Sequence, residues 1–104
     1  MSIVRNVVKK NFHRDSVQLL RLSEEAKRID GIKDAAIVMG TTTNKEILSK
    51  LGILTEEGRA AHESDMILAV TAESEALVEK GLREIEAIVL RPPAAKGQRF
   101  YNLD

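Results

Sequence analysis

The chain has 104 residues, with sixteen basic side chains balanced by sixteen acidic ones, only 3% aromatic residues and no cysteine. This length predicts one domain with its own apolar core. Without cysteine there are no disulfides and no thiolate ligands for a metal, and a neutral, aromatic-poor chain is a poor match to nucleic-acid binding. No apolar run is long enough for a membrane span or a signal peptide, so we expect a cytoplasmic protein without membrane contact.

The first third of the chain predicts a strand followed by a helix. Residues 3–10 are rich in β-branched side chains and predict the strand. Asp15 and Gln18 have the spacing of a capping box, which predicts that a helix begins just after Asp15. Apolar residues then recur every three or four positions as far as Ile29, and Gly31 is suited to the turn that follows.

The middle of the chain repeats this order. Residues 35–39 are almost wholly apolar and predict a buried strand. Thr43 and Glu46 form a second capping-box pair, which predicts a helix that Gly52 ends. A single helical turn is expected within residues 55–61, although a glycine inside it weakens the pattern.

The last elements are a strand and a long helix. Residues 66–72 predict the strand, and residues 74–90 carry apolar side chains at helical spacing. Two prolines at positions 92 and 93 stop this helix. We therefore expect one domain over residues 1–90 and a linker-like tail over residues 91–104.

The aromatic pair in this tail has a second interpretation. Phe100 and Tyr101 are two of the three aromatic residues in the chain. They would instead form an edge strand or dock on a partner.

The order strand-helix-strand-helix-strand-helix predicts an α/β fold with a small sheet covered by helices. We expect a two-layer α+β sandwich of ferredoxin-like arrangement, with the short helix inserted between the second and third strands. Three strands do not decide whether the helices lie on one face or on both.

A polar loop follows the second strand and suggests a ligand site. Gly40 ends the strand, Thr41, Thr42 and Asn44 supply hydrogen-bond donors, and Lys45 supplies a positive charge. Because a helix N-terminus attracts anions, these residues predict an anion or carboxylate site. The alternative is that the same residues form only a turn and a helix cap.

A second polar loop follows the first strand and contains Arg14 and Ser16. If the first two strands were parallel neighbours, both loops would face one crevice, where α/β sheets bind ligands. Arg14 and Ser16 would then join Gly40 and Lys45 at one ligand. The alternative is a helix cap preceded by solvated charges.

No catalytic or metal site emerges from the sequence. His13 and His62 are the only histidines, no serine lies in a nucleophile-elbow motif, and the His62–Asp65 stretch is typical of a solvated turn. We predict no catalytic residue, no metal ligand and no cofactor held by this chain.

Three sequence blocks suggest a family. They are F-x-x-D-S-V-x-L at the first helix, A-x-V-M-G-T-x-x-N-K at the polar loop, and G-x-L-T-x-E-G-x-A-A followed by D-x-x-x-A-V at the third strand. Over residues 8–90 the chain resembles the N-terminal domain of FdrA-like proteins, which are similar to the acyl-CoA synthetase (succinyl-CoA ligase) superfamily.

This resemblance implies an accessory role, because the CoA-binding and ligase-like domains of the full-length family have no counterpart here. It implies a non-catalytic subunit or domain of an acyl-CoA synthetase-like or carbamoyl-transfer system, with CoA or a nucleotide bound by a partner. Expected partners are a second copy of the chain, a CoA-ligase-like protein, or both. The alternative is a free-standing regulatory domain that senses a small molecule as a homodimer.

Overall fold

The computed structural model of the chain describes residues 2–90. Three strands and four helices follow one another in the predicted order, with short helices between the second and third strands. The elements are β1 (Ile3–Lys9), α1 (Ser16–Lys27), β2 (Ile32–Met39), α2 (Thr42–Leu51), α3 (Glu56–Arg59), β3 (Met66–Ala72) and α4 (Glu75–Leu90). The tail over residues 91–104, and with it the interpretation of Phe100 and Tyr101, lies outside the described residues.

The sheet has the order β1-β3-β2, and β3 pairs with both neighbours in antiparallel fashion. All seven residues of β3 are buried, as expected of a central apolar strand. β1 and β2 therefore run in the same direction but are not neighbours, because β3 lies between them. This corrects the sequence-based idea that the first two strands lie side by side.

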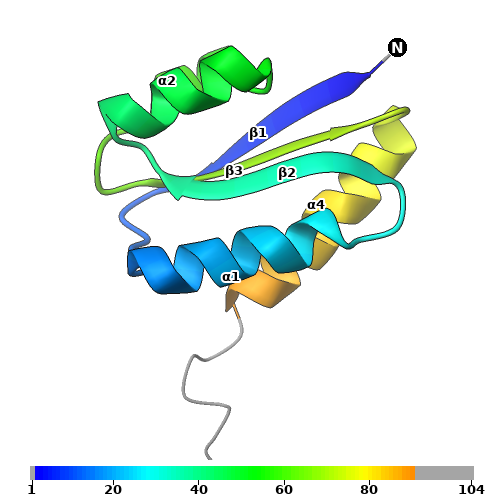
Figure 1. The fold of residues 1–104 in the computed structure, drawn as a ribbon, viewed down its shortest axis with the longest axis horizontal. Coiled ribbons are helices and arrows are strands. Elements are labelled where there is room, and N and C mark those ends of the chain that lie inside the picture. The colour runs from blue at the N-terminus through cyan, green and yellow to red at the C-terminus, as the bar shows by residue number, and fades with distance from the viewer. Residues whose placement is uncertain (1, 91–104) are drawn as a thin grey trace, which may run out of the picture.

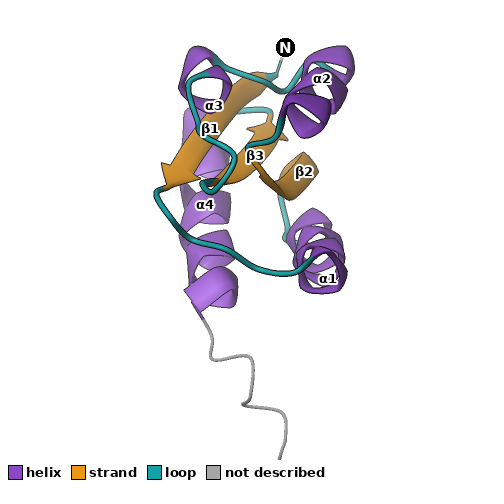
Figure 2. Cartoon of the chain, turned by 90° about the vertical axis from the view of Figure 1, so that its left-hand side faces the viewer, coloured by secondary structure: helices purple, strands orange, loops and turns teal. Residues whose placement is uncertain are grey.

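Helices cover both faces of the sheet (Figures 1 and 2). α1 and α4 pack on one face around Leu68 and Val70, and α2 and α3 pack on the other around Ile67 and Ala69. The strand order and the α1–α4 layer confirm the ferredoxin-like α+β arrangement. The inserted helices α2 and α3 form an additional layer, so the helices lie on both faces of the sheet and not on one.

The helix ends depend on local capping. Asp15 caps α1 as predicted, since its carboxylate accepts the Gln18 N–H at 2.9 Å. At α2 the predicted cap, Thr43, is wrong. Thr41 is the residue with extended backbone, and its hydroxyl accepts the Asn44 N–H at 3.2 Å. Because α2 begins at Thr42, Thr43 already lies inside its first turn.

The glycine after α2 was predicted correctly. Gly52 follows the helix with a φ of 77°, a left-handed conformation that suits glycine because it has no Cβ. The chain can therefore leave α2 without strain.

The free edge of β2 is blocked by polar groups from the same chain. The Ser23 hydroxyl of α1 accepts the Ile37 N–H at 2.9 Å and donates to the Ile37 carbonyl at 3.2 Å. The Asp34 carboxylate accepts the N–H of Ala35, and the Asn44 amide donates to the Met39 carbonyl. Natural sheets cover edges in such ways because an open edge pairs with other chains.

Replacing Ser23 with alanine tests this edge. We expect Ser23→Ala to lower the free energy of unfolding by about 1–2 kcal/mol, because the N–H and carbonyl of Ile37 lose their partner in a half-buried place. Ser49→Ala, at an exposed position of α2, is the matched control. Urea denaturation of both variants measures the difference, and equal midpoints would show that Ser23 does not stabilise the edge.

Candidate functional site

Three loops meet at one end of the sheet, where β1 and β2 end and β3 begins. The Gly40 N–H donates to the Asp65 carbonyl at 2.8 Å, which joins the end of β2 to the start of β3. The Asn11 N–H, just after β1, donates to the Asp65 carboxylate at 2.9 Å. Asp65 therefore links the loop after β1 to the loop after β2.

The Asp65 side chain acts as a clamp between these loops. Only 2% of the residue is exposed. Its second oxygen accepts the His62 N–H at 3.0 Å, and the His62 Nδ1 atom lies 3.6 Å away. The Asn11 N–H, followed by that of His62, holds the pKa of the Asp65 carboxyl below its usual value, because both donors favour the charged form.

Gly40 is required by close packing. Its φ is not positive, so the backbone conformation alone does not demand glycine. A Cβ at this position would lie 2.4 Å from the His62 carbonyl oxygen and 3.1 Å from the Ala61 Cβ. The loop before β3 therefore passes too close for any side chain at Gly40.

The polar residues after Gly40 are engaged inside the fold. The Asn44 amide donates to the Met39 carbonyl at 2.9 Å. The Lys45 ammonium donates to the Arg59 carbonyl at 2.7 Å and to the Ala61 carbonyl. Because helix C-termini leave carbonyls without intrahelical partners, Lys45 has a capping role at the end of α3.

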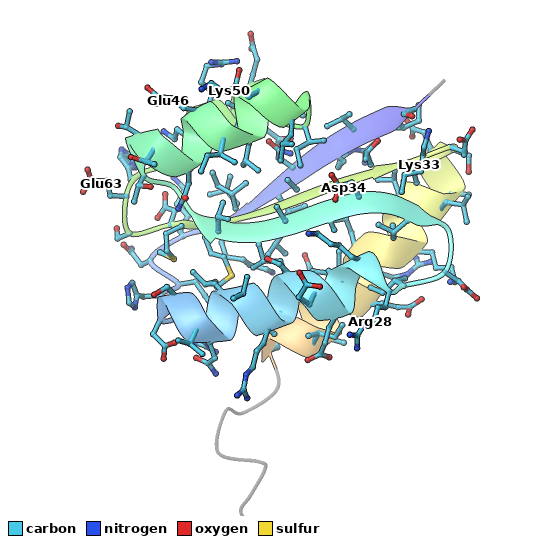
Figure 3. The ribbon with its side chains drawn as sticks, in the orientation of Figure 1. Arg28, Lys33, Asp34, Glu46, Lys50 and Glu63 are labelled. Atoms are coloured by element: carbon cyan, nitrogen blue, oxygen red, sulfur yellow. The ribbon has the colours of Figure 1, made fainter. Side chains whose placement is uncertain are left out.

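The role of Lys45 gives a stability prediction. We expect Lys45→Met to lower the free energy of unfolding by about 1–2 kcal/mol, because two carbonyls lose a charged donor while the aliphatic stem is kept. Lys50→Met on the same helix is the control, since Lys50 has no polar partner among residues 2–90 and extends from α2 (Figure 3). Thermal denaturation that does not distinguish the two variants would contradict the capping role.

The other predicted site residues are Arg14, Ser16 and Thr42. Within residues 2–90, their side chains form no hydrogen bond or ion pair with the residues around Gly40 and Lys45. Arg14 donates to the His13 carbonyl at 3.0 Å and stacks over the Phe12 ring, 4.4 Å from its centroid. Ser16 and Thr42 are the exposed first residues of α1 and α2. The structure thus places Gly40, Thr41, Asn44 and Lys45 in one cluster, while Arg14 belongs to a separate one.

An open groove lies beside this cluster, between β1 and α3. Its volume is about 400 Å³, and its lining residues are Val7, Val8, Lys10, Glu57, Ala60, Ala61 and Asp65. The lining combines an apolar floor with one cation and two carboxylates. Sequence reasoning did not identify this groove, because β1 and α3 are distant in the chain.

Asn6 is a second buried polar residue that the sequence reasoning missed. Only 1% of it is exposed. Its amide donates to the Ile53 carbonyl at 2.9 Å and accepts the Thr55 N–H at 2.7 Å. An uncharged polar residue among the β-branched residues of the strand was the available signal. The function of Asn6 is to fix the segment between α2 and α3.

The fold defines a small α+β domain of ferredoxin-like order with an inserted helical layer, and comparison with known proteins identifies its family. The model of the family described as "AllF, heavy metal-associated domain" matches residues 1–101, and the chain belongs to this family. No solved structure gave a significant match.

A curated relative places the domain in a longer chain. The uncharacterized protein YahF of Escherichia coli is 38% identical over 85 residues, which are 82% of this chain. The same alignment covers 16% of YahF, so this chain spans only a small part of that relative.

The family description raises the question of a heavy metal, and the residues do not fit one. Soft thiolate ligands are absent, since the chain has no cysteine. Within residues 2–90 no three His, Cys, Asp or Glu side chains gather in one place. The carboxylate beside His62 belongs to Asp65 and is held by two backbone donors.

Within residues 2–90, no helix is both long and apolar enough to cross a membrane.

Proposed function

We propose that this AllF-type domain is a non-catalytic accessory module of an acyl-CoA synthetase-like or carbamoyl-transfer system in the cytoplasm. The observation that carries the proposal is its relation to YahF: most of this chain aligns with a small fraction of a much longer protein. A module of that kind contributes an assembly surface, while CoA or a nucleotide is bound by the partner.

The contacts of the predicted site residues support an accessory role. Asn44 and Lys45 use their polar atoms to hold the chain together, and the Asp65 carboxylate holds two loops. No nucleophile and base are paired in the described part of the chain, as transfer through a covalent acyl-enzyme would require.

Co-purification tests this role. The tagged full-length chain is expressed at its natural level and isolated from its own cell extract, and the eluate is analysed by native mass spectrometry. We expect a polypeptide with ligase-like or transferase-like sequence in fixed stoichiometry, and no turnover of acyl-CoA by the isolated chain. Turnover by the isolated chain, or isolation of this chain without such a polypeptide, would contradict the proposal.

Anion binding beside the start of α2 is a second part of the proposal. It rests on the position of Gly40, Thr41, Asn44 and Lys45 at the N-terminus of α2. It requires the Lys45 ammonium to leave the Arg59 and Ala61 carbonyls and Arg14 to turn from the His13 carbonyl towards this group. Titration calorimetry with inorganic phosphate and with succinate tests it on the wild type, Arg14→Ala and Lys45→Met. Binding that both substitutions weaken is expected, and unchanged binding in both folded variants would end this part.

The alternative function is a free-standing sensor that binds a small molecule as a homodimer. The groove of about 400 Å³ between β1 and α3 favours it. A ligand for this groove would raise the melting temperature of the isolated chain without any ligase-like partner. The co-purification experiment separates this function from the accessory role.

A further inference from the structure

The two edges of the sheet differ in a way that identifies an interaction surface. At β2, Ser23, Asp34 and Asn44 bond to outward-facing backbone groups: the N–H of Ala35, the N–H and carbonyl of Ile37, and the carbonyl of Met39. β1 forms the opposite edge. Every second residue of β1 turns its N–H and carbonyl away from β3, towards this edge.

The hydrogen bonds of Ser23 show which backbone groups of β1 face β3. Because both backbone groups of Ile37 bond to Ser23, they face away from β3, and Ile37 and Leu68 form a non-hydrogen-bonded pair. Leu68 must therefore turn its N–H and carbonyl towards β1, where its partner is Val7.

The alternation of an antiparallel pair then sets the rest of β1. If Val7 faces β3, the backbone groups of Val4, Asn6 and Val8 face the free edge. None of these groups has a hydrogen-bond partner among residues 2–90. Within residues 2–90, one edge of the sheet is thus blocked and the other is open.

Two grooves flank the open edge. One is the groove towards α3 described above. The other, of about 280 Å³, lies on the α4 side and is lined by Val7, Glu79, Leu82, Arg83 and Glu86. An added strand would therefore find backbone partners along β1 and space for its side chains on both faces, as in β-strand addition.

We propose that a second copy of this chain occupies this edge, with the two β1 strands antiparallel around Asn6. This register places Val4 opposite Val8 of the second copy on the α3 side. On the α4 side it places Arg5 of the second copy opposite Val7, beside the groove that holds Glu79, Arg83 and Glu86. Within one copy Arg5 pairs with Glu75 and Lys9 pairs with Glu86, so Glu79 is the carboxylate of this groove without an ion pair among residues 2–90. Like charges are not placed opposite one another on β1, and Arg5 of one copy lies beside Glu79 of the other.

The result is a continuous six-stranded sheet with blocked β2 edges at both ends. Since two seven-residue strands and their flanking side chains form a small interface, the dimer is expected to dissociate on dilution. This inference goes beyond the accessory role and does not depend on it, because a chain can pair with itself with or without a ligase-like partner.

Sedimentation velocity of the full-length chain over a wide concentration range tests the inference. We expect a reversible equilibrium between the 11.5 kDa monomer and a dimer. Val4→Pro removes an outward N–H without removing a bond to β3, and Glu79→Arg places a cation opposite Arg5. Each variant should raise the dimer dissociation constant at least about tenfold.

Glu46→Arg is the matched control, because it makes the same charge change on the outer side of α2 (Figure 3). It should leave the dissociation constant unchanged, and circular dichroism confirms that all variants fold. A monomer at every concentration would overturn the inference, whether β1 is then bare or covered by residues 91–104. So would a dimer that Val4→Pro and Glu79→Arg leave intact.

Discussion

Replacing Asp65 with alanine should lower the melting temperature of the domain by roughly 10 °C. The carboxylate accepts the N–H groups of Asn11 and His62, and the alanine side chain can accept neither. Both donors then lose their partner in a half-buried place, and the loop after β1 loses its link to the start of β3.

The charge of Asp65 also makes a prediction for pH. Its pKa is lower in the folded chain, chiefly because of the Asn11 N–H, so its contribution to stability is present above the ordinary aspartate pKa of about 4. That contribution is lost as the pH falls below about 4 towards the folded value. Stability should therefore decline with acid in the wild type, and less steeply in Asp65→Asn.

Thermal denaturation at a series of pH values measures both effects. Asp65→Asn keeps one acceptor oxygen and should lose less stability at neutral pH than Asp65→Ala. Glu63→Ala is the control in the same loop, because Glu63 is exposed and has no polar partner within residues 2–90 (Figure 3). If Glu63→Ala destabilised the domain as much as Asp65→Ala, the clamp would not be the cause.

The second large effect is expected at Gly40. Gly40→Ala should lower the free energy of unfolding by about 3 kcal/mol, because the added Cβ meets a backbone carbonyl that cannot move aside alone. Separating the two segments would also weaken the bond from the Gly40 N–H to the Asp65 carbonyl.

Gly52→Ala provides the comparison. It lies in the left-handed region, and a Cβ added there would have no heavy atom within 4 Å, so only backbone strain of about 1 kcal/mol is expected. Urea denaturation should rank Gly40→Ala well below Gly52→Ala in stability. The reverse order would contradict the close approach between the end of β2 and the loop before β3.

Much of the fold could be predicted from local sequence pattern. The strand at residues 66–72, the cap at Asp15 and the end of α2 at Gly52 all depend on neighbours within a few positions. Thr43 was wrong as a cap although it alone of the three threonines has a glutamate three positions later. The cap is Thr41, whose hydroxyl accepts the Asn44 N–H.

The candidate site could be predicted only in part. The sequence singled out the loop with Gly40 and Lys45, but the contacts of these residues come from positions 59–65. No local pattern indicates that Lys45 reaches the end of α3 or that β3 separates the first two strands. The sequence predicted Asp65 to lie in a solvated turn, whereas its side chain is buried. Its position directly before a fully buried strand was the available signal of that burial.

Amide hydrogen exchange of the full-length chain at low concentration is the most direct test of how the polar groups of this domain are used. We expect slow exchange at Ala35 and Ile37, whose N–H groups are held by Asp34 and Ser23. Fast exchange is expected at Val4, Asn6 and Val8, with protection that grows as concentration rises. Equal protection of both edges at every concentration would contradict a sheet with one blocked edge and one open to a second copy.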